Sequence, residues 1–227
     1  MPRPIPTRIF HLTPIANLAK LCIAGEICSK NALVARGEVH ESIAHNSIQT
    51  RRAEKPVGCA PGRVIHDYVP FYFAPRSPML HAIQSGKVAG CRWRQEDIVH
   101  IESTVENVVA SGKQFAIYPM NAALDFSTEC YGTLEGLTRV DWSLLFETPL
   151  LGGFAKYYFS RLDPPRHAQR MEKRQAEFLV YDAFALSTAT RIGVISNAKQ
   201  TEVAGMLAQH GVKLTVEVQP NWYFLGQ

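Results

Sequence analysis

Residues 8–25 read RIFHLTPIANLAKLCIAG and carry the clearest secondary-structure signal of the chain. Residues 8–12 alternate loosely between polar and apolar side chains, which predicts a strand. Thr13 is a typical N-cap and the proline after it is typical of the first helical position, so a helix is predicted over 14–24. Gly25 supplies a natural stop. The stretch therefore predicts a strand that leads directly into a helix.

Two polar side chains stand where this strand ends. His11 and Thr13 are two residues apart, so they share one face of the strand at the mouth of the predicted helix. The free N–H groups of a helix N-terminus attract anions, and the arrangement suits the ribose, amide or phosphate of a nucleotide. The alternative is a buried histidine bonded to a neighbouring carbonyl, beside an ordinary threonine cap. The residues alone leave both interpretations open.

Farther along the chain, strands and helices are interspersed without a regular βαβ order. Segment 30–63 lacks a sustained apolar period and is interpreted as a long loop with a short helix at 41–51, a candidate ligand lid. The other predicted elements are strands at 67–73, 97–101, 114–118, 176–181 and 212–218 and helices at 77–85, 104–110, 142–146 and 198–209. This order disfavours a parallel sheet and favours one mixed α+β domain over residues 1–227.

The composition is that of an ordinary globular protein. With 46% hydrophobic and 19% charged residues, the 227-residue chain is neither disordered nor fibrous. Its five cysteines are odd in number and lack a CxxC spacing, which indicates neither a disulfide framework nor a zinc site and favours a reducing cytoplasm. The chain has no apolar run of membrane-spanning length, so neither export nor membrane insertion is expected. The common nucleotide and metal motifs are absent, and no metal is expected.

Glu177 lies within the apolar strand AEFLVY, residues 176–181. A carboxylate in such a strand costs desolvation free energy unless it faces an open cleft or is paired. A substrate hydroxyl or a basic neighbour would compensate it. The alternative is an edge-strand glutamate that faces water or pairs with Lys173 or Arg174.

Two basic segments could contact phosphates. The segment SIQTRR ends on Arg51 and Arg52, which would diverge on a helix, so one could face a ligand while the other faces solvent. Residues 161–174 hold five basic and two acidic side chains, a net charge of +3. Solvated surfaces are the alternative for both segments.

Five blocks, in order along the chain, resemble the DarT family of DNA ADP-ribosyltransferase toxins. They are IFHLTPIANL (9–18), SIQTRR (47–52), HDYVPFYFAPRSPML (66–80), KRQAEFLVY (173–181) and NWYF (221–224). The resemblance implies an α+β, ADP-ribosyltransferase-like fold of mixed, mostly antiparallel sheets with flanking helices. It also implies an enzyme that binds NAD as co-substrate without a metal, transfers ADP-ribose to thymine in a short motif of single-stranded DNA and releases nicotinamide. A DarG-like macrodomain antitoxin is the implied partner, and the cytoplasm the implied location.

The resemblance also implies roles for individual residues. Glu177 would be the catalytic glutamate and Arg52 the catalytic arginine, which would also contact NAD. The nicotinamide half of NAD would be contacted by His11, Leu12 and Thr13, and NAD would further be approached by Lys20 and Cys28. The chain departs from the family pattern at 116–126, AIYPMNAALDF, where relatives more often carry a polar Asp-Gly-His-like element, and at the long stretch 31–39.

Single-stranded DNA requires a positive track and aromatic platforms on which bases stack. The expected track is Arg161, Arg166, Arg170 and Arg174, with the aromatic residues at 157–159 just before the catalytic strand. Two other functions remain open on the sequence. One is ADP-ribosylation of protein or RNA, because loops choose the acceptor; the other is a non-catalytic nucleic-acid-binding module that uses the basic segments.

Overall fold

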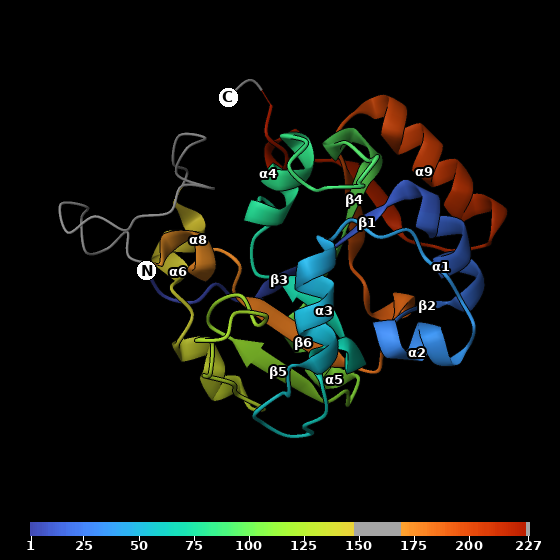
Figure 1. Ribbon diagram of the computed structural model, residues 1–227. Helices are drawn as coiled ribbons and strands as arrows, with labels where there is room; N and C mark the ends of the chain where they lie inside the picture. The colour runs from blue at the N-terminus through green and yellow to red at the C-terminus, as the bar shows by residue number, and fades with distance from the viewer. Residues whose placement is uncertain (148–168, 226–227) are drawn as a thin grey trace.

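The structure is a computed structural model that describes residues 1–147 and 169–225. A seven-stranded sheet lies at the centre of this part of the chain (Figure 1). Its order is β5-β6-β3-β1-β4-β8-β9, and each pairing is antiparallel except the parallel β8–β9 pair. A second sheet pairs β2 with β7. The strands are β1 (Arg8–Pro14), β2 (Glu26–Cys28), β3 (Tyr68–Tyr72), β4 (Ile98–Thr104), β5 (Phe115–Tyr118), β6 (Glu177–Tyr181), β7 (Ala183–Ala185), β8 (Arg191–Val194) and β9 (Thr215–Val218). The predicted mixed, mostly antiparallel α+β architecture is confirmed.

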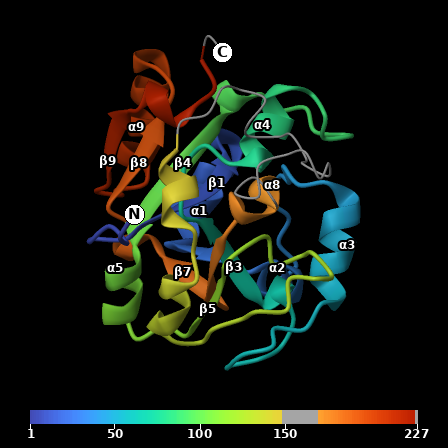
Figure 2. The same cartoon turned by 90° about the vertical axis from the view of Figure 1, so that its left-hand side faces the viewer.

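Short helices flank the sheet. They are α1 (Leu18–Ala24), α2 (Lys30–Ala35), α3 (Asn46–Glu54), α4 (Pro78–Gln84), α5 (Val105–Ala110), α6 (Trp142–Phe146), α8 (Arg170–Lys173) and α9 (Asn197–Gln209). Figure 2 shows α5 and α9 toward one side of the molecule and α3 toward the other, and α1 packs against α9. In the described part of the chain, no helix is long and apolar enough to span a bilayer.

The core lies on the central strands. Every residue of β4 is buried, as are the first four residues of β6. Ile9, Phe71 and Phe178, from three adjacent strands, are fully buried in the largest apolar cluster. Because the sheet is covered in this way, a charged residue within β6 must find its partner inside the protein.

The first strand is longer than predicted, and the helix that follows it begins later. β1 continues to Pro14, a 3-10 turn occupies Ile15–Asn17, and α1 starts only at Leu18. Thr13 is therefore not an N-cap, because its whole segment is paired with β4. Gly25 ends α1 as predicted, in the left-handed conformation with its N–H bonded to the carbonyl of Leu21.

Most other predicted elements are present within a few residues of the expected bounds. Ser77 and Thr104 cap α4 and α5 through their side chains. Segment 30–63 is more structured than expected, since it contains α2, and its later helix lies at Asn46–Glu54 rather than at 41–51. Tertiary packing outweighs the weak apolar period of these residues.

One prediction about the cysteines was wrong. Cys59 and Cys130 form a disulfide with Cα atoms 5.6 Å apart, across a sequence separation of 71 residues. The pairing of Tyr131 with Ile117 brings this segment back along β5 and places Cys130 against the loop after α3. No spacing rule reveals a contact between such distant residues, whereas Cys22, Cys28 and Cys91 are free as expected.

Candidate active site

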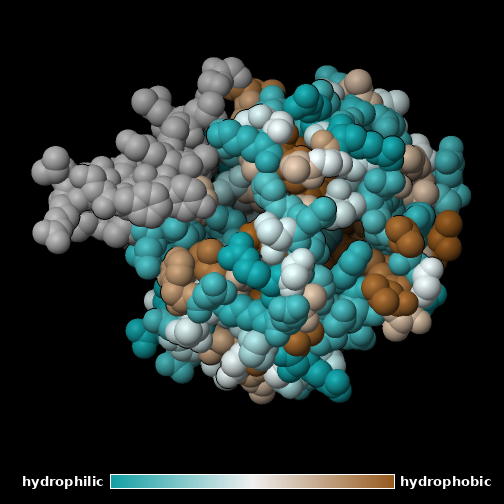
Figure 3. Space-filling model, in the orientation of Figure 1, coloured by the Kyte–Doolittle hydropathy of each residue, from teal (hydrophilic) through white to brown (hydrophobic). Residues whose placement is uncertain are grey.

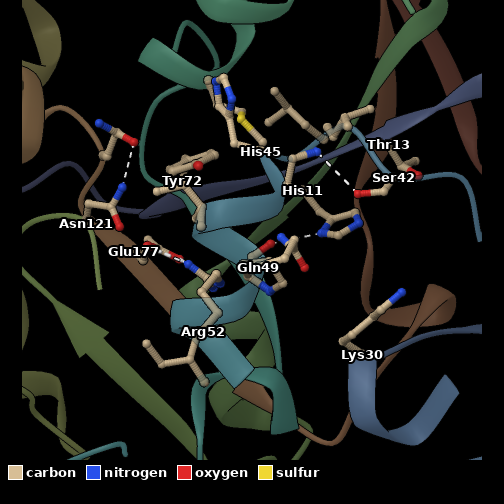
Figure 4. A pocket seen from close by; sticks show the side chains of 18 of the residues that line it. His11, Thr13, Lys30, Ser42, His45, Gln49, Arg52, Tyr72, Asn121 and Glu177 are labelled. Atoms are coloured by element: carbon tan, nitrogen blue, oxygen red, sulfur yellow. Dashed lines mark hydrogen bonds and ion pairs between the residues drawn. The ribbon is translucent and has the colours of Figure 1, made fainter. Parts of the chain in front are cut away.

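A cavity of about 520 Å³ opens between α3, the ends of β1, β3 and β6, and the segment 40–45. Figure 3 shows the face that carries α3 as mostly hydrophilic, with scattered apolar side chains. Figure 4 shows the interior, where side chains from these elements converge. The volume is in the range of pockets that hold small molecules and cofactors.

Glu177 is the most buried carboxylate of this cavity. It is the first residue of β6, opposite Tyr72 of β3 and Tyr118 of β5, and it is 1% exposed. Its Oε2 accepts a hydrogen bond of 2.9 Å from Nη1 of Arg52, and its Oε1 accepts one of 2.9 Å from the backbone N–H of Ala122. The sequence left open whether a substrate hydroxyl, water or a basic side chain compensates this carboxylate. In the structure the compensating group is the basic side chain of Arg52, and neither Lys173 nor Arg174.

Arg52 lies in the last turn of α3 and is 8% exposed. Its Nη1 also lies 3.1 Å from Oε1 of Glu177, so a single guanidinium nitrogen serves both carboxylate oxygens. The Nη2 of Arg52 is buried and has no hydrogen-bond partner among the described residues. A buried N–H donor without a partner is costly, so this nitrogen is suited to a ligand acceptor. Arg51 is half-buried and lines the same cavity, so the two arginines are not divided between ligand and solvent as the sequence suggested.

The pKa of the neighbouring Tyr72 phenol is also shifted. Burial and the negative charge of Glu177 together raise the pKa of Tyr72 well above its usual value, against the opposing charge of Arg52. Tyr72 therefore remains a neutral phenol at physiological pH and lines the cavity beside the ion pair (Figure 4).

His11 and Thr13 line the same cavity as Glu177. His11 Nδ1 lies 2.9 Å from the carbonyl oxygen of Pro70 and donates a hydrogen bond to it. Burial lowers the pKa of His11 to about 4, the Pro70 carbonyl opposing and nearby His40 adding to the shift. His11 is therefore neutral at pH 7. His11 therefore bonds a neighbouring carbonyl, as the second interpretation of the sequence expected, and it also lines the cavity, so a contact with a nucleotide stays a prediction.

The segment 40–45 covers the cavity beside β1. Asn17 donates to the carbonyl of Glu41 at 3.0 Å and accepts from its N–H at 2.9 Å, while also donating to Oγ1 of Thr13 at 3.1 Å. Lys20 donates to the carbonyl of Val39. These bonds hold residues 39–41 against the 3-10 turn that follows β1 and against α1.

The structure separates the predicted NAD contacts into two groups. His11, Leu12, Thr13, Cys28 and Arg52 line the cavity. Lys20, in contrast, is exposed and reaches the base of the lid. Burial raises the pKa of the Cys28 thiol to about 11, so Cys28 contributes an uncharged thiol.

The predicted DNA track is corrected at two of its four positions. Arg170 is 5% exposed and pairs with Glu147 at 2.5 Å, and Arg174, 3% exposed, donates to the carbonyl of Glu147 at 2.9 Å. Their guanidinium groups are buried because α8 packs against α6, so they do not present a surface track. Arg161 and Arg166 lie outside the described residues.

Several residues of the cavity were not singled out from the sequence. Gln49 and His66 bond each other at 3.1 Å, and burial, with the charge of Arg52, lowers the pKa of His66 to about 4. Asn121 and Gln175 lie beside Glu177. The only signal for Asn121 was the unusual composition of 116–126. Gln175 precedes the predicted strand and carried no signal.

The profile of a family described as "ssDNA thymidine ADP-ribosyltransferase, DarT" matches residues 10–224. A protein of Thermus sp. (strain 2.9) named DNA ADP-ribosyl transferase is 36% identical over 223 residues, 97% of this chain and 98% of its own. The solved structure of Thermus sp. 2.9 DarT with ADP-ribosylated ssDNA has a TM-score of 0.85 at 34% identity and covers 99% of both chains. The same Thermus protein with NAD+ has a TM-score of 0.81 at 32% identity, covering 98% of this chain and 100% of that one.

Proposed function

This chain belongs to the DarT family of single-stranded-DNA thymidine ADP-ribosyltransferases, and we propose that it transfers ADP-ribose from NAD to thymine with Glu177 and Arg52 as its catalytic pair. One observation carries the assignment of residues. The buried carboxylate of Glu177 lies in the same cavity as His11 and Thr13 and is held by Arg52 and by the Ala122 N–H. A buried, paired carboxylate that lines a cavity of this size is a candidate catalytic group.

The transfer exchanges one bond at the ribose for another. The bond between ribose C1′ and the nicotinamide nitrogen breaks, and nicotinamide leaves with the bonding electron pair as a neutral molecule. The ribose passes through an oxocarbenium-like transition state, whose positive charge a carboxylate on the adjacent hydroxyl stabilises. Glu177 is fixed by its two donors for that role.

The acceptor is the ring nitrogen N3 of thymine, because N1 carries the deoxyribose. N3 forms the new bond to C1′ and loses its proton to the Glu177 carboxylate or to water. Arg52 does not take this proton, because a guanidinium stays protonated in proteins. Its Nη2, which lacks a partner among the described residues, instead donates to a thymine carbonyl and stabilises the negative charge that develops on the base.

NAD occupies the β1 side of the cavity in this proposal. The nicotinamide half lies against His11, Leu12 and Thr13, and Cys28 lines the wall beyond. Neutral His11 carries its proton on Nδ1, which donates to the Pro70 carbonyl, and this leaves Nε2 as an acceptor for a ligand N–H or hydroxyl. Lys20 acts on NAD through the lid, whose backbone it binds at Val39.

Biological context follows from the chemistry. NAD and DNA meet in the cytoplasm of a bacterial cell, which is where we place the protein. Modification of DNA bases is toxic, so we propose that the enzyme acts as the toxin of a toxin–antitoxin pair. Its partner would be a macrodomain antitoxin of the DarG type, which removes the modification. Growth arrest on expression, relieved by co-expression of that partner, tests this part.

Separate incubations with labelled NAD and pools of DNA, RNA and protein test the acceptor. We expect label in single-stranded DNA alone, and a mass increase of one ADP-ribose on a thymine nucleotide. Label in protein or RNA, with DNA unmodified, would contradict the proposal. Glu202→Gln, on the outer face of α9, is a matched control that should retain full activity.

A further inference from the structure

Two side-chain amides lie beside the catalytic pair, and no role follows for them from the transfer chemistry. Asn121, 8% exposed, comes from the loop after β5, and Gln175 comes from the segment just before β6. Both line the cavity that holds Glu177. Figure 4 shows Asn121 next to Glu177 and Arg52.

The two amides orient each other. Asn121 Nδ2 donates to Oε1 of Gln175 at 2.8 Å, and Asn121 Oδ1 accepts from the N–H of Ala123 at 2.8 Å. Gln175 Nε2 donates to the carbonyl of Met171 at 3.2 Å. Because each amide makes two bonds within the protein, its plane is fixed before any ligand arrives.

These bonds leave a defined set of groups for a ligand. An amide nitrogen carries two N–H donors, so Asn121 Nδ2 and Gln175 Nε2 each keep one N–H that no described residue uses. Asn121 Oδ1 is already engaged by Ala123. The pair therefore offers mainly N–H donors at one end of the cavity.

The position of these donors is tied to that of the reacting carboxylate. Ala122, the residue after Asn121, supplies the N–H that holds Glu177, and Gln175 is two residues before Glu177 in the chain. Asn121 N–H also bonds the carbonyl of Glu172, which joins the two segments. A base whose ring nitrogen reaches the ribose beside Glu177 would therefore enter the same cavity as the pair.

We propose that the Asn121–Gln175 amide pair reads a carbonyl of the target pyrimidine and so selects thymine over cytosine. Thymine N3 is flanked by two carbonyl acceptors, O2 and O4. In cytosine an amino donor replaces O4. An N–H donor from Asn121 fits the thymine carbonyl and opposes the cytosine amino group. Arg52 Nη2 and the amide pair then hold the two carbonyls on either side of the attacking nitrogen.

The inference rests on the proposed function, since it concerns the acceptor base of that reaction. Asn121→Asp is the informative substitution. Asp retains an oxygen for the N–H of Ala123 but has no N–H donor, and Gln175 can rotate its amide to donate to the new carboxylate. The loop around Ala122 is thereby maintained while the donor to the base is lost.

The test combines this variant with altered bases. Transfer to oligonucleotides carrying thymine, 4-thiothymine, 2-thiothymine or cytosine at the target position is measured for the wild type, Asn121→Asp and the remote control Asn107→Asp, which lies in α5. Sulfur is a weaker hydrogen-bond acceptor than oxygen, so the thio base that replaces the carbonyl read by Asn121 should be a poorer substrate. For that base, kcat/KM of the wild type and of Asn107→Asp should fall about tenfold relative to thymine. For Asn121→Asp the corresponding loss should be near twofold. Asn121→Asp should bind NAD within about twofold of the wild type.

The outcomes are distinct. Equal thio effects in the wild type and Asn121→Asp would overturn the base-reading role, as would a loss of NAD affinity that matches the loss of transfer. Acceptance of cytosine by Asn121→Asp but not by the wild type would support it, since a carboxylate can accept from the cytosine amino group. If the wild type modifies no thymine oligonucleotide at all, the proposed function itself fails, and the inference with it.

Discussion

At the scale of single residues, the site depends on a buried ion pair whose partners are 125 residues apart. Removing water from both Glu177 and Arg52 is costly, and their mutual attraction and the Ala122 N–H offset that cost. The desolvated carboxylate thereby has a fixed position before substrates bind. A ligand hydroxyl and a base carbonyl can then add to this arrangement without reorganising it.

Arg52→Lys tests the geometry of the arginine. Lysine carries a positive charge but cannot reach Glu177 and a base carbonyl through two separate nitrogens. We expect kcat for DNA modification to fall about 100-fold, with NAD affinity little changed. A variant that retains most of the wild-type rate would argue against positioning through the guanidinium.

Buried neutral histidines make the stability of the fold depend on pH. Burial lowers the pKa of His100 to about 4, and His11 and His66 have pKa values lowered to about 4 as well. In the unfolded chain these groups titrate near pH 6.5, so between about pH 6.5 and 4 the unfolded state binds more protons. The free energy of unfolding should therefore decrease as pH falls through this window.

Urea unfolding at pH 7.5, 6.0 and 5.0 measures this decrease. His100→Gln keeps a donor for the carbonyl of Pro75 and removes one titrating group, so its stability should vary less with pH than that of the wild type. Substitution of the exposed His210 serves as the control. An identical pH dependence in His100→Gln would show that this histidine is not held neutral.

At the scale of elements, the two donors of Glu177 come from separate parts of the chain that are joined nearby. α3 supplies Arg52, and the loop after β5 supplies Ala122. Lys55, directly after α3, donates to the carbonyls of Leu124 and Ser127 in that loop. The Cys59–Cys130 disulfide joins the same two regions.

Cys130→Ser should lower the free energy of unfolding. The bond closes a loop of 71 residues, and the chain-entropy account gives about 4 kcal/mol for a loop of this size. Chemical denaturation without reductant compares Cys130→Ser with Cys91→Ser, whose cysteine is free. Equal midpoints for the two variants would contradict a stabilising disulfide.

The buried position of Arg170 changes what its removal is expected to do. Arg170→Ala breaks the contact of α8 with Glu147, whose side chain is 33% exposed, and should lower stability by about 1–3 kcal/mol. Arg166→Ala, at a position of the proposed DNA track, should reduce the salt dependence of DNA binding by about one unit of slope. If Arg170→Ala instead reduced the salt dependence of DNA binding and left stability unaltered, Arg170 would belong to the DNA track as the sequence predicted.

The sequence predicts elements well where the signal is local. The Ser77 cap and the Gly25 stop depend on neighbouring residues, and both are confirmed. The start of α1 was misplaced because pairing with β4 extends β1 through Thr13. The partner of Glu177, the disulfide and the burial of Arg170 could not be predicted, since each depends on contacts between residues distant in the chain.

At the scale of the whole molecule, the sheet brings three separate regions to one cavity. β1 contributes His11 and Thr13, α3 contributes Arg52, and β6 contributes Glu177. The antiparallel order β6-β3-β1 sets the carboxylate one strand away from β1, with Tyr72 of β3 between them. The side chains proposed to contact nicotinamide and the proposed catalytic carboxylate thus come from strands separated by one strand, β3.

The rate of ADP-ribose transfer by Glu177→Gln tests the central claim most directly. Glutamine keeps the size of the side chain and can still accept from Arg52 and Ala122, but it lacks the charge that stabilises an oxocarbenium-like ribose. With a thymine oligonucleotide and saturating NAD, we expect transfer to fall at least 100-fold, while the dissociation constant of NAD stays within about threefold of the wild type. Transfer at the wild-type rate by this variant would contradict the account.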